Sequence, residues 1–109
     1  MKQYAAGEII LLMFPFTDGS ETKRRSALVL RDTEDEDIIV ARITSQVVQT
    51  TFDVQLLDWQ KAGLLFPSVA RVHKVATLEK RLIDHRLGKV TRRDWSRIRA
   101  IIRRLWTSI

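Results

Sequence analysis

The chain has 109 residues, 45% of them hydrophobic, so we expect one folded domain, residues 1–109, rather than a disordered segment. It has no cysteine, which excludes disulfides and thiolate metal sites, and no apolar run approaches the ~18 residues of a membrane-spanning helix. A formal net charge of +6 favours a polyanion: RNA, DNA, an acidic protein or an anionic membrane. Residues 1–7 lack the apolar core of a signal peptide, so we expect a cytoplasmic protein.

The first two thirds of the chain have the pattern of short strands separated by polar turns. The expected strands are Ile9–Phe14, Ala27–Leu30, Ile38–Ile43, Phe52–Leu57 and Ser68–Val75. The polar segment Thr17–Lys23 is the expected loop of the first hairpin. Trp59–Gly63 resembles a short helical turn that ends with a glycine in the left-handed conformation. This succession predicts a mainly β protein folded as a small barrel, because closure removes exposed strand edges.

The acidic segment Asp32–Asp37 is expected to be a solvated hairpin loop. It does not fit a calcium-binding loop, because Asp37 occupies the sixth position, where glycine is required. The sequence also has no glycine-rich phosphate loop and no H-E-x-x-H pattern. We therefore expect no metal site and no cofactor.

The periodicity of the apolar residues changes toward the C-terminus. Gly88 interrupts the chain, Thr91 is a good helix N-cap, and Asp94 completes a T-x-x-D pattern that resembles a capping box. Apolar residues then recur at helical spacing, at Trp95, Ile98, Ile102, Leu105 and Ile109. We expect this stripe to pack on the barrel or on a partner subunit, with the surrounding arginines in solvent. The segment Leu78–Leu87 also has helical spacing and could form a second helix.

The most informative segment is Gly7–Leu30, which reads G-E-I-I-L-L-M-F-P-F-T-D-G-S-E-T-K-R-R-S-A-L-V-L. It resembles the opening of the MazF/PemK family of toxin ribonucleases, which has a G-[DE]-[IV] strand, F-x-[FP], a loop and K-x-R-P-A-[LV]-V-L. I-T-S-Q at 43–46, A-G-L-L-F-P-S-V at 62–69 and K-V-A-T-L at 74–78 extend the resemblance in the same order. It therefore covers most of the chain.

The resemblance implies an SH3-like barrel with a C-terminal helix, assembled as a symmetric homodimer. It also implies the toxin of a type II toxin–antitoxin system that cleaves single-stranded RNA without a metal. In that reaction a ribose 2′-OH attacks the adjacent phosphate, giving a 2′,3′-cyclic phosphate and a 5′-OH. The expected partners are single-stranded RNA and an acidic, partly disordered antitoxin segment that occupies the same groove, and not a membrane.

Arg25 and Thr44 are the candidate catalytic residues. Arg25 precedes the second expected strand, and its guanidinium is a planar fork of donors suited to the charge that develops on a phosphate under attack. Without the resemblance, a solvated loop tip would explain it equally well. Thr44 ends the third expected strand, where the family has a Thr or Ser beside that arginine, and its hydroxyl would orient the reacting groups.

The expected RNA-binding residues surround this pair. They are Thr17, Lys23, Arg24, Ser45, Gln46, Arg71 and His73. Arg71 and His73 are two residues apart and would share one face of a strand, just before a turn-like Thr77-Leu78-Glu79. His73 has the chemistry of a general acid or base, and with His85 a two-histidine mechanism is possible, although both also fit ordinary surface histidines.

One position departs from the family pattern. Ser26 follows Arg25 where the family usually has proline, which would restrict Arg25 to an extended backbone. The greater freedom of serine would loosen the placement of the Arg25 guanidinium and so affect the catalytic rate more than the fold. The alternative function is therefore a non-catalytic SH3-like module that binds nucleic acid or protein.

Overall fold

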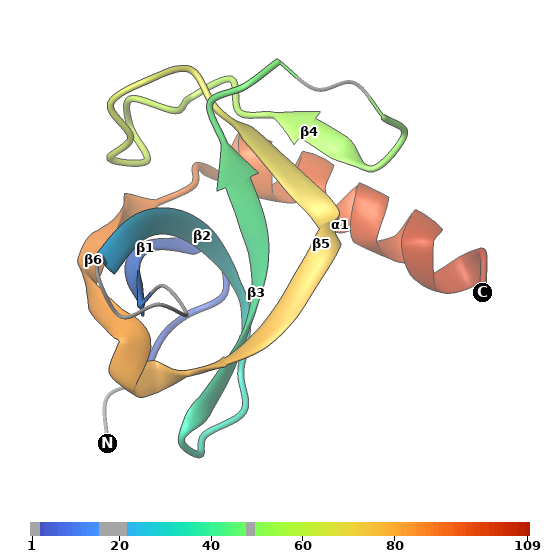
Figure 1. The fold of residues 1–109 in the computed structure, drawn as a ribbon. Helices are drawn as coiled ribbons and strands as arrows, with labels where there is room; N and C mark the ends of the chain where they lie inside the picture. Colours follow the sequence, from blue (N-terminus) through green and yellow to red (C-terminus); the bar gives the residue numbers. More distant parts are fainter. Residues whose placement is uncertain (1–2, 16–21, 48–49) are drawn as a thin grey trace.

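The computed structural model describes residues 3–15, 22–47 and 50–109, which form a six-stranded sheet and one long helix (Figure 1). The elements are β1 Glu8–Pro15, β2 Thr22–Asp32, β3 Asp37–Thr44, β4 Asp53–Gln55, β5 Val69–Glu79, β6 Ile83–Lys89 and α1 Arg92–Thr107, with a 3₁₀ turn at Lys80–Leu82. Every neighbouring pair is antiparallel, in the order β4-β5-β3-β2-β1-β6. No helix in the described part of the chain is long and apolar enough to cross a membrane.

The sheet curls so that its two faces bury two different apolar clusters. The cluster inside the curl contains Ile10, Leu12, Ala27, Val29, Ile38 and Val40. The other cluster lies between the sheet and α1 and contains Ile9, Leu28, Ile43 and Ile98. Successive side chains of a strand point to opposite faces, so β1 and β2 contribute alternate residues to each cluster. The expected fold, a mainly β SH3-like barrel with a C-terminal helix, is confirmed.

Strands β4 and β6 are the two edges of the described sheet and do not pair with each other. The tight turn Trp59–Gly63 packs against β6 at this opening. Gly63 ends the turn with φ +89°, as the sequence predicted for Trp59–Gly63. A Cβ on Gly63 would lie 2.1 Å from the backbone oxygen of Leu87, and one on Gly88 would lie 2.3 Å from that of Ala62. Only glycine at both positions lets the two backbones approach so closely.

The prediction of a helix over Leu78–Leu87 is wrong. This segment contains the end of β5, the 3₁₀ turn and most of β6. Pairing of β6 with β1 extends the sheet, and Leu78, Leu82 and Ile83 pack on the cluster inside the curl. Tertiary strand pairing therefore overrides the helical spacing of the apolar residues in this segment.

Strand β2 begins earlier than predicted. Lys23, Arg24 and Arg25 were expected in a loop and at its mouth, but they lie within the strand, opposite Phe14, Met13 and Leu12 of β1. Because these three residues pair with β1, their successive side chains point to opposite faces of the sheet. This alternation decides which side of the sheet each charge occupies.

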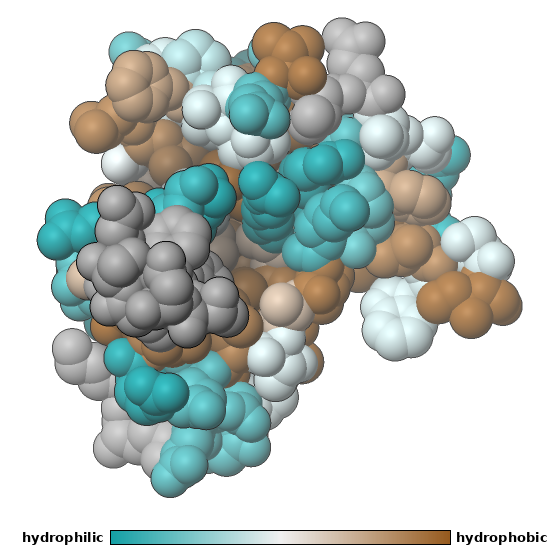
Figure 2. Space-filling model, viewed as in Figure 1, coloured by the Kyte–Doolittle hydropathy of each residue, from teal (hydrophilic) through white to brown (hydrophobic). Residues whose placement is uncertain are grey.

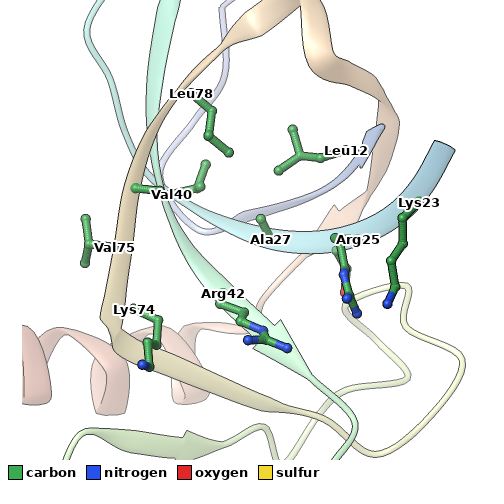
Figure 3. A pocket seen from close by; sticks show the side chains of 11 residues that line it. Leu12, Lys23, Arg25, Ala27, Val40, Arg42, Lys74, Val75 and Leu78 are labelled. Carbon is green, nitrogen blue, oxygen red and sulfur yellow. The ribbon is translucent and has the colours of Figure 1, made fainter. Parts of the chain in front are cut away.

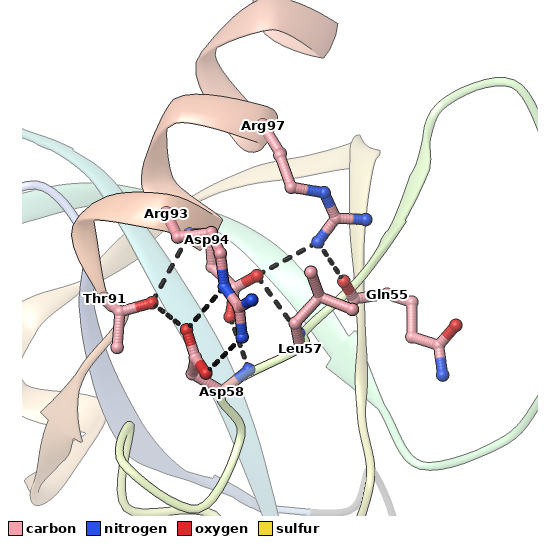
Figure 4. Close-up of polar contacts among 7 residues, drawn as sticks. All are labelled: Gln55, Leu57, Asp58, Thr91, Arg93, Asp94 and Arg97. Atoms are coloured by element: carbon pink, nitrogen blue, oxygen red, sulfur yellow. Dashed lines mark hydrogen bonds and ion pairs between the residues drawn. The ribbon is translucent and has the colours of Figure 1, made fainter.

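Strand β4 is shorter than the predicted Phe52–Leu57, because a carboxylate of α1 takes over its backbone donors. Asp94 is 1% exposed, and its Oδ1 and Oδ2 accept hydrogen bonds from the backbone N–H groups of Leu57 (3.0 Å) and Asp58 (2.8 Å) (Figure 4). Arg97 donates to Asp94 Oδ1 (3.0 Å) and to the carbonyl of Gln55 (2.6 Å). The helix is thereby fixed to the chain that leaves β4.

The same helix end makes a second set of bonds, centred on Asp58. The Thr91 side chain caps the helix by accepting from the Asp94 N–H (3.4 Å), as the capping pattern predicted, and donates to Asp58 Oδ2 (2.6 Å). Arg93 binds Asp58 with two nitrogens, at 3.1 and 2.6 Å. The bonds from Arg93 and Thr91 lower the pKa of Asp58.

Asp32 ties the N-terminal segment and the start of the 3₁₀ turn to the end of β2. The sequence placed it in a solvated loop, but it is 8% exposed. Its carboxylate accepts from the Tyr4 N–H (2.8 Å) and pairs with Lys80 (2.7 Å). Burial would raise the pKa of Asp32, but the bonds from Lys80, Tyr4 and Glu34 outweigh it and lower the pKa to about 2.

Replacing Asp94 with Ala should lower the free energy of unfolding by about 3 kcal/mol, because two partly buried backbone donors and Arg97 lose their acceptor. Urea denaturation followed by circular dichroism measures this. The matched control is Glu36→Ala, an exposed carboxylate whose side chain has no hydrogen bond among the described residues. Equal stability of the two variants would contradict the role given to Asp94.

Replacing Asp32 with Asn should lower the free energy of unfolding at pH 7, and the difference from the wild type should become smaller in acid. Because the folded-state pKa is depressed, the stabilisation by the carboxylate is complete above its unfolded value of 3.8 and is lost as the pH falls toward about 2. Denaturation midpoints of both proteins between pH 7 and pH 2.5 should therefore converge in acid. A difference that stays constant with pH would show that the charge of Asp32 is not responsible.

Candidate functional site

The alternation of β2 divides the basic residues at its start between the two faces of the sheet. Lys23 and Arg25 share the face of Ala27, which lies in the cluster inside the curl. Arg24 and Ser26 share the face of Leu28, toward the helix side. The three consecutive basic residues are therefore not one cluster, and each face receives part of the charge.

On the face of Arg25 is a pocket of about 520 Å³, which we call the concave pocket. Its apolar lining comes from four strands: Leu12, Ala27, Val40, Val75, Ala76 and Leu78. Figure 3 shows the nitrogens of Lys23, Arg25, Arg42 and Lys74 along one edge, with Leu12, Val40 and Leu78 on the opposite side. The concave pocket thus joins an apolar floor to a cationic rim.

A second pocket of about 510 Å³ lies on the other face, and we call it the loop pocket. The loop after β4 forms one wall through Leu64, Leu65 and Phe66, and β6 contributes His85 and Leu87. The polar lining consists of Arg24, Arg25, Ser26, Arg42, Thr44, Ser45, Gln46, Ser68 and His85. No carboxylate lines either pocket among the described residues.

Arg25, Ser26 and Arg42 line both pockets and therefore form the boundary between them. Both arginine side chains are exposed at this boundary. The seven ion pairs that the described residues form involve neither of them. Two guanidinium groups at one pocket boundary, without acidic neighbours in the lining, form a site for an anion that accepts several hydrogen bonds, such as a phosphate.

Thr44 ends β3 at the loop pocket, as the sequence indicated. Its Oγ1 accepts a hydrogen bond from the Gln46 N–H (3.1 Å), which holds the turn that follows the strand. The hydroxyl proton stays available to a ligand oxygen, because a hydroxyl can accept and donate at once. The structure thus brings Arg25 and Thr44 to one pocket, together with the predicted Arg24, Ser45 and Gln46.

Two of the predicted RNA-binding residues lie outside both pockets. The Arg71 guanidinium binds Asp53 (Nε–Oδ1 3.0 Å), whose side chain is 2% exposed. Burial would raise the pKa of Asp53, but hydrogen bonds from Thr50 and Arg71 outweigh it and lower the pKa. His73 lies in a bulge of β5, with its ring 5.9 Å from that of Phe52. The predicted Thr17 lies outside the described residues.

Arg42 and His85 also line the loop pocket, and neither was among the site residues predicted from the sequence. Arg42 interrupts the apolar strand β3 two positions before Thr44, and this i, i+2 spacing was the available signal. His85 was considered only as a partner for His73, within a segment that was predicted to be helical. It lies in the loop pocket on β6, and its Nδ1 is 2.7 Å from Asp84 Oδ2.

The donors at this site suit an anion better than a metal ion. Within residues 3–15, 22–47 and 50–109, no group of three His, Cys, Asp or Glu residues is placed to hold a metal. The pockets instead offer guanidinium, ammonium, hydroxyl and amide groups. Such groups can bind a phosphate backbone, offset charge that develops on phosphorus and donate a hydrogen bond to a ribose or phosphate oxygen.

Residues 5–106 match the sequence model of a family described as PemK-like, MazF-like toxin of type II toxin–antitoxin system. Among curated proteins, no sequence matches significantly.

Several solved structures have a similar fold. A MazE–MazF complex from Deinococcus radiodurans aligns with TM-score 0.77 and 22% identity over 94% of each chain. The Mycobacterium tuberculosis toxin MazF-mt6 aligns with TM-score 0.71 and 20% identity over 87% of this chain and 91% of the toxin. An endoribonuclease from a mycobacterial species aligns with TM-score 0.70 and 14% identity over 93% of this chain and 88% of the enzyme.

Proposed function

The chain belongs to the family of PemK-like, MazF-like toxins of type II toxin–antitoxin systems, and on this premise we propose that it is an endoribonuclease that cleaves single-stranded RNA. The observation that carries the proposal is the loop pocket, which Arg25, Arg42 and Thr44 line together, with both arginines at its boundary with the concave pocket. Two similar structures are named as endoribonucleases, one of them in complex with its cognate antitoxin.

The reaction is an internal transfer at phosphorus. The ribose 2′-oxygen forms a bond to the adjacent phosphorus, the bond from phosphorus to the 5′-oxygen breaks, and the products are a 2′,3′-cyclic phosphate and a 5′-OH. The 2′-OH loses its proton, and the leaving 5′-oxygen gains one. The enzyme must hold the strand unstacked and stabilise the additional negative charge on the phosphoryl oxygens.

Arg25 supplies the charge stabilisation in this proposal. Its guanidinium offers two parallel donors to the phosphoryl oxygens. Arg42 adds a second cation at the same boundary. Thr44, with its Oγ1 anchored by the Gln46 N–H, donates its proton to an oxygen of the reacting ribose or phosphate and so orients it. The chemistry assigned to these residues requires no metal.

The partners follow from the same family. We propose an antitoxin with an acidic, partly disordered segment that covers the cationic rim and competes with RNA, since such a peptide matches the charge of the groove. Two of the similar structures are MazE–MazF complexes. We also propose a homodimer. Trp106 and Ile109, which are 69% and 90% exposed at the end of α1, offer apolar surface to a second copy.

Purified protein should cleave single-stranded RNA in EDTA and leave a cyclic phosphate. Arg25→Ala and Arg25→Lys should reduce the cleavage rate by roughly a hundredfold or more, because lysine keeps the charge but loses the planar fork. Thr44→Ala should reduce the cleavage rate by a smaller factor, because Thr44 orients a reacting group and does not neutralise charge. Single-turnover rates and mass spectrometry of the 3′ ends measure both results.

The matched control is Arg31→Ala, which removes an exposed arginine of the same strand outside both pockets. Its rate should equal that of the wild type. Full activity of Arg25→Lys would show that a point charge is sufficient. If the wild type binds RNA but does not cleave it, the alternative of a non-catalytic binding module is supported. Ser26→Pro, which restores the residue that the family usually has after Arg25, is then the first variant to test for cleavage.

RNA affinity should fall with salt. If Lys23, Arg24 and Arg42 together neutralise about three phosphates of a single strand, the slope of log K against log salt should be about −2. Arg42→Gln should make it shallower by about 0.7, whereas Arg99→Gln, an exposed arginine of α1, should leave it unchanged. Anisotropy with a 2′-O-methylated RNA, which cannot be cleaved, measures these slopes. An unchanged slope for Arg42→Gln would remove Arg42 from the phosphate site.

A further inference from the structure

We propose that Phe66 is a stacking platform for one unpaired nucleobase of the RNA, next to the cleaved phosphate. The inference rests on the proposed function and adds a base-binding subsite to it. Phe66 is 65% exposed although it is a large apolar residue, and it lines the loop pocket that also contains Arg25 and Thr44. An exposed aromatic ring beside a row of cations is the combination by which proteins hold single-stranded nucleic acid.

The ring stands on an anchored loop. The carbonyl of Phe66 accepts a hydrogen bond from the Ser68 hydroxyl (2.7 Å), and the Ser68 carbonyl accepts from the Leu56 N–H (2.9 Å). Pro67 restricts the backbone of Phe66 to extended conformations. A phenyl side chain has only two torsions, so little entropy is lost when a base stacks on a ring presented in this way.

The other end of the loop is anchored as well. The Leu64 N–H donates to the carbonyl of Trp59 (3.1 Å), and Ala62 is 1% exposed. The turn also lies against β6 through the close approach of Gly63 and Gly88. The loop therefore presents Phe66 from a fixed frame.

The surroundings favour a nucleobase over an apolar protein side chain. The polar lining around Phe66 is cationic or neutral and contains no carboxylate among the described residues. Figure 2 shows the apolar side chains of the loop before β5, at the upper left, directly above hydrophilic ones. A nucleotide joins an apolar base face to a charged phosphate through a single ribose, so a ring in the same pocket as Arg24 and Arg25 matches both parts of it.

The ring also lies where a base would be unstacked. In-line attack of a 2′-OH requires the bases on either side of the phosphate to leave their regular stack, and each then exposes a π-face. Stacking on Phe66 replaces the contact that the base lost. Because every base has a π-face, this subsite would hold the strand without selecting its sequence.

The test uses the full chain and an RNA that contains its cleavage site, 2′-O-methylated at the scissile nucleotide. Phe66→Leu and Phe66→Ala should weaken binding about tenfold, and Phe66→Trp should retain affinity, because only a ring can stack. Leu57→Ala, which removes an exposed apolar side chain that lines neither pocket, is the matched control and should bind as the wild type does. Thermal unfolding should be unchanged in all four variants, because neither side chain is buried.

A scan with abasic nucleotides identifies the stacked base. Removing the base at one position should weaken RNA binding by the wild type about tenfold. The same abasic RNA should bind Phe66→Ala as tightly as the intact RNA does, because this variant has no ring for the base to stack on. Wild-type affinity of Phe66→Leu, or an equal penalty at every abasic position in both proteins, would overturn the subsite while wild-type cleavage still upheld the ribonuclease.

Two other results would also overturn the subsite. If Phe66→Leu changes the mass in sedimentation velocity but not the RNA affinity, this face binds protein. If the wild type neither binds nor cleaves RNA, the proposed function and the subsite are both wrong.

Discussion

The buried carboxylate of Asp94 holds the structure together at the point where the sheet, the helix and the site meet. It accepts hydrogen bonds from the N–H groups of Leu57 and Asp58, which lie just after β4 in a partly buried part of the chain. A charged acceptor makes these bonds stronger than neutral ones. The chain between β4 and β5 starts from this fixed point, and that chain carries the wall of the loop pocket with Leu64 and Phe66. The geometry of the loop pocket therefore depends on a residue that lies outside both pockets.

Arginine has two separate functions in this protein. Arg71, Arg93 and Arg97 are bound to carboxylates and hold strands and helix in place. Arg25 and Arg42 have no such partner among the described residues and face the pockets. The same side chain is structural where an aspartate has been buried beside it and available to a ligand where none has. The net charge of +6 favours an anionic partner without locating it, and the placement of the aspartates decides where the free cations gather.

The parts of the fold that were predicted from the sequence are those with local causes. The first strand, the start of α1 at its Thr91 cap and the left-handed Gly63 each depend on residues within a few positions. The helix predicted for Leu78–Leu87 failed because its spacing also fits an edge strand, and pairing with β1, more than sixty residues earlier, decided between them. The same pairing placed His85 in the loop pocket, where no local pattern would have put it.

The sequence by itself determined the class of the protein. Its first hairpin, its strand ends and its capped helix predict a basic, mainly β toxin of this family with Arg25 and Thr44 as the candidate pair. The tertiary structure decided which residues share a pocket. It separated Lys23 and Arg24 onto opposite faces, added Arg42 and His85, and engaged Arg71 with Asp53. The physical reason is that strand register and a buried carboxylate act between residues far apart in the chain, and neither leaves a signal in the local sequence.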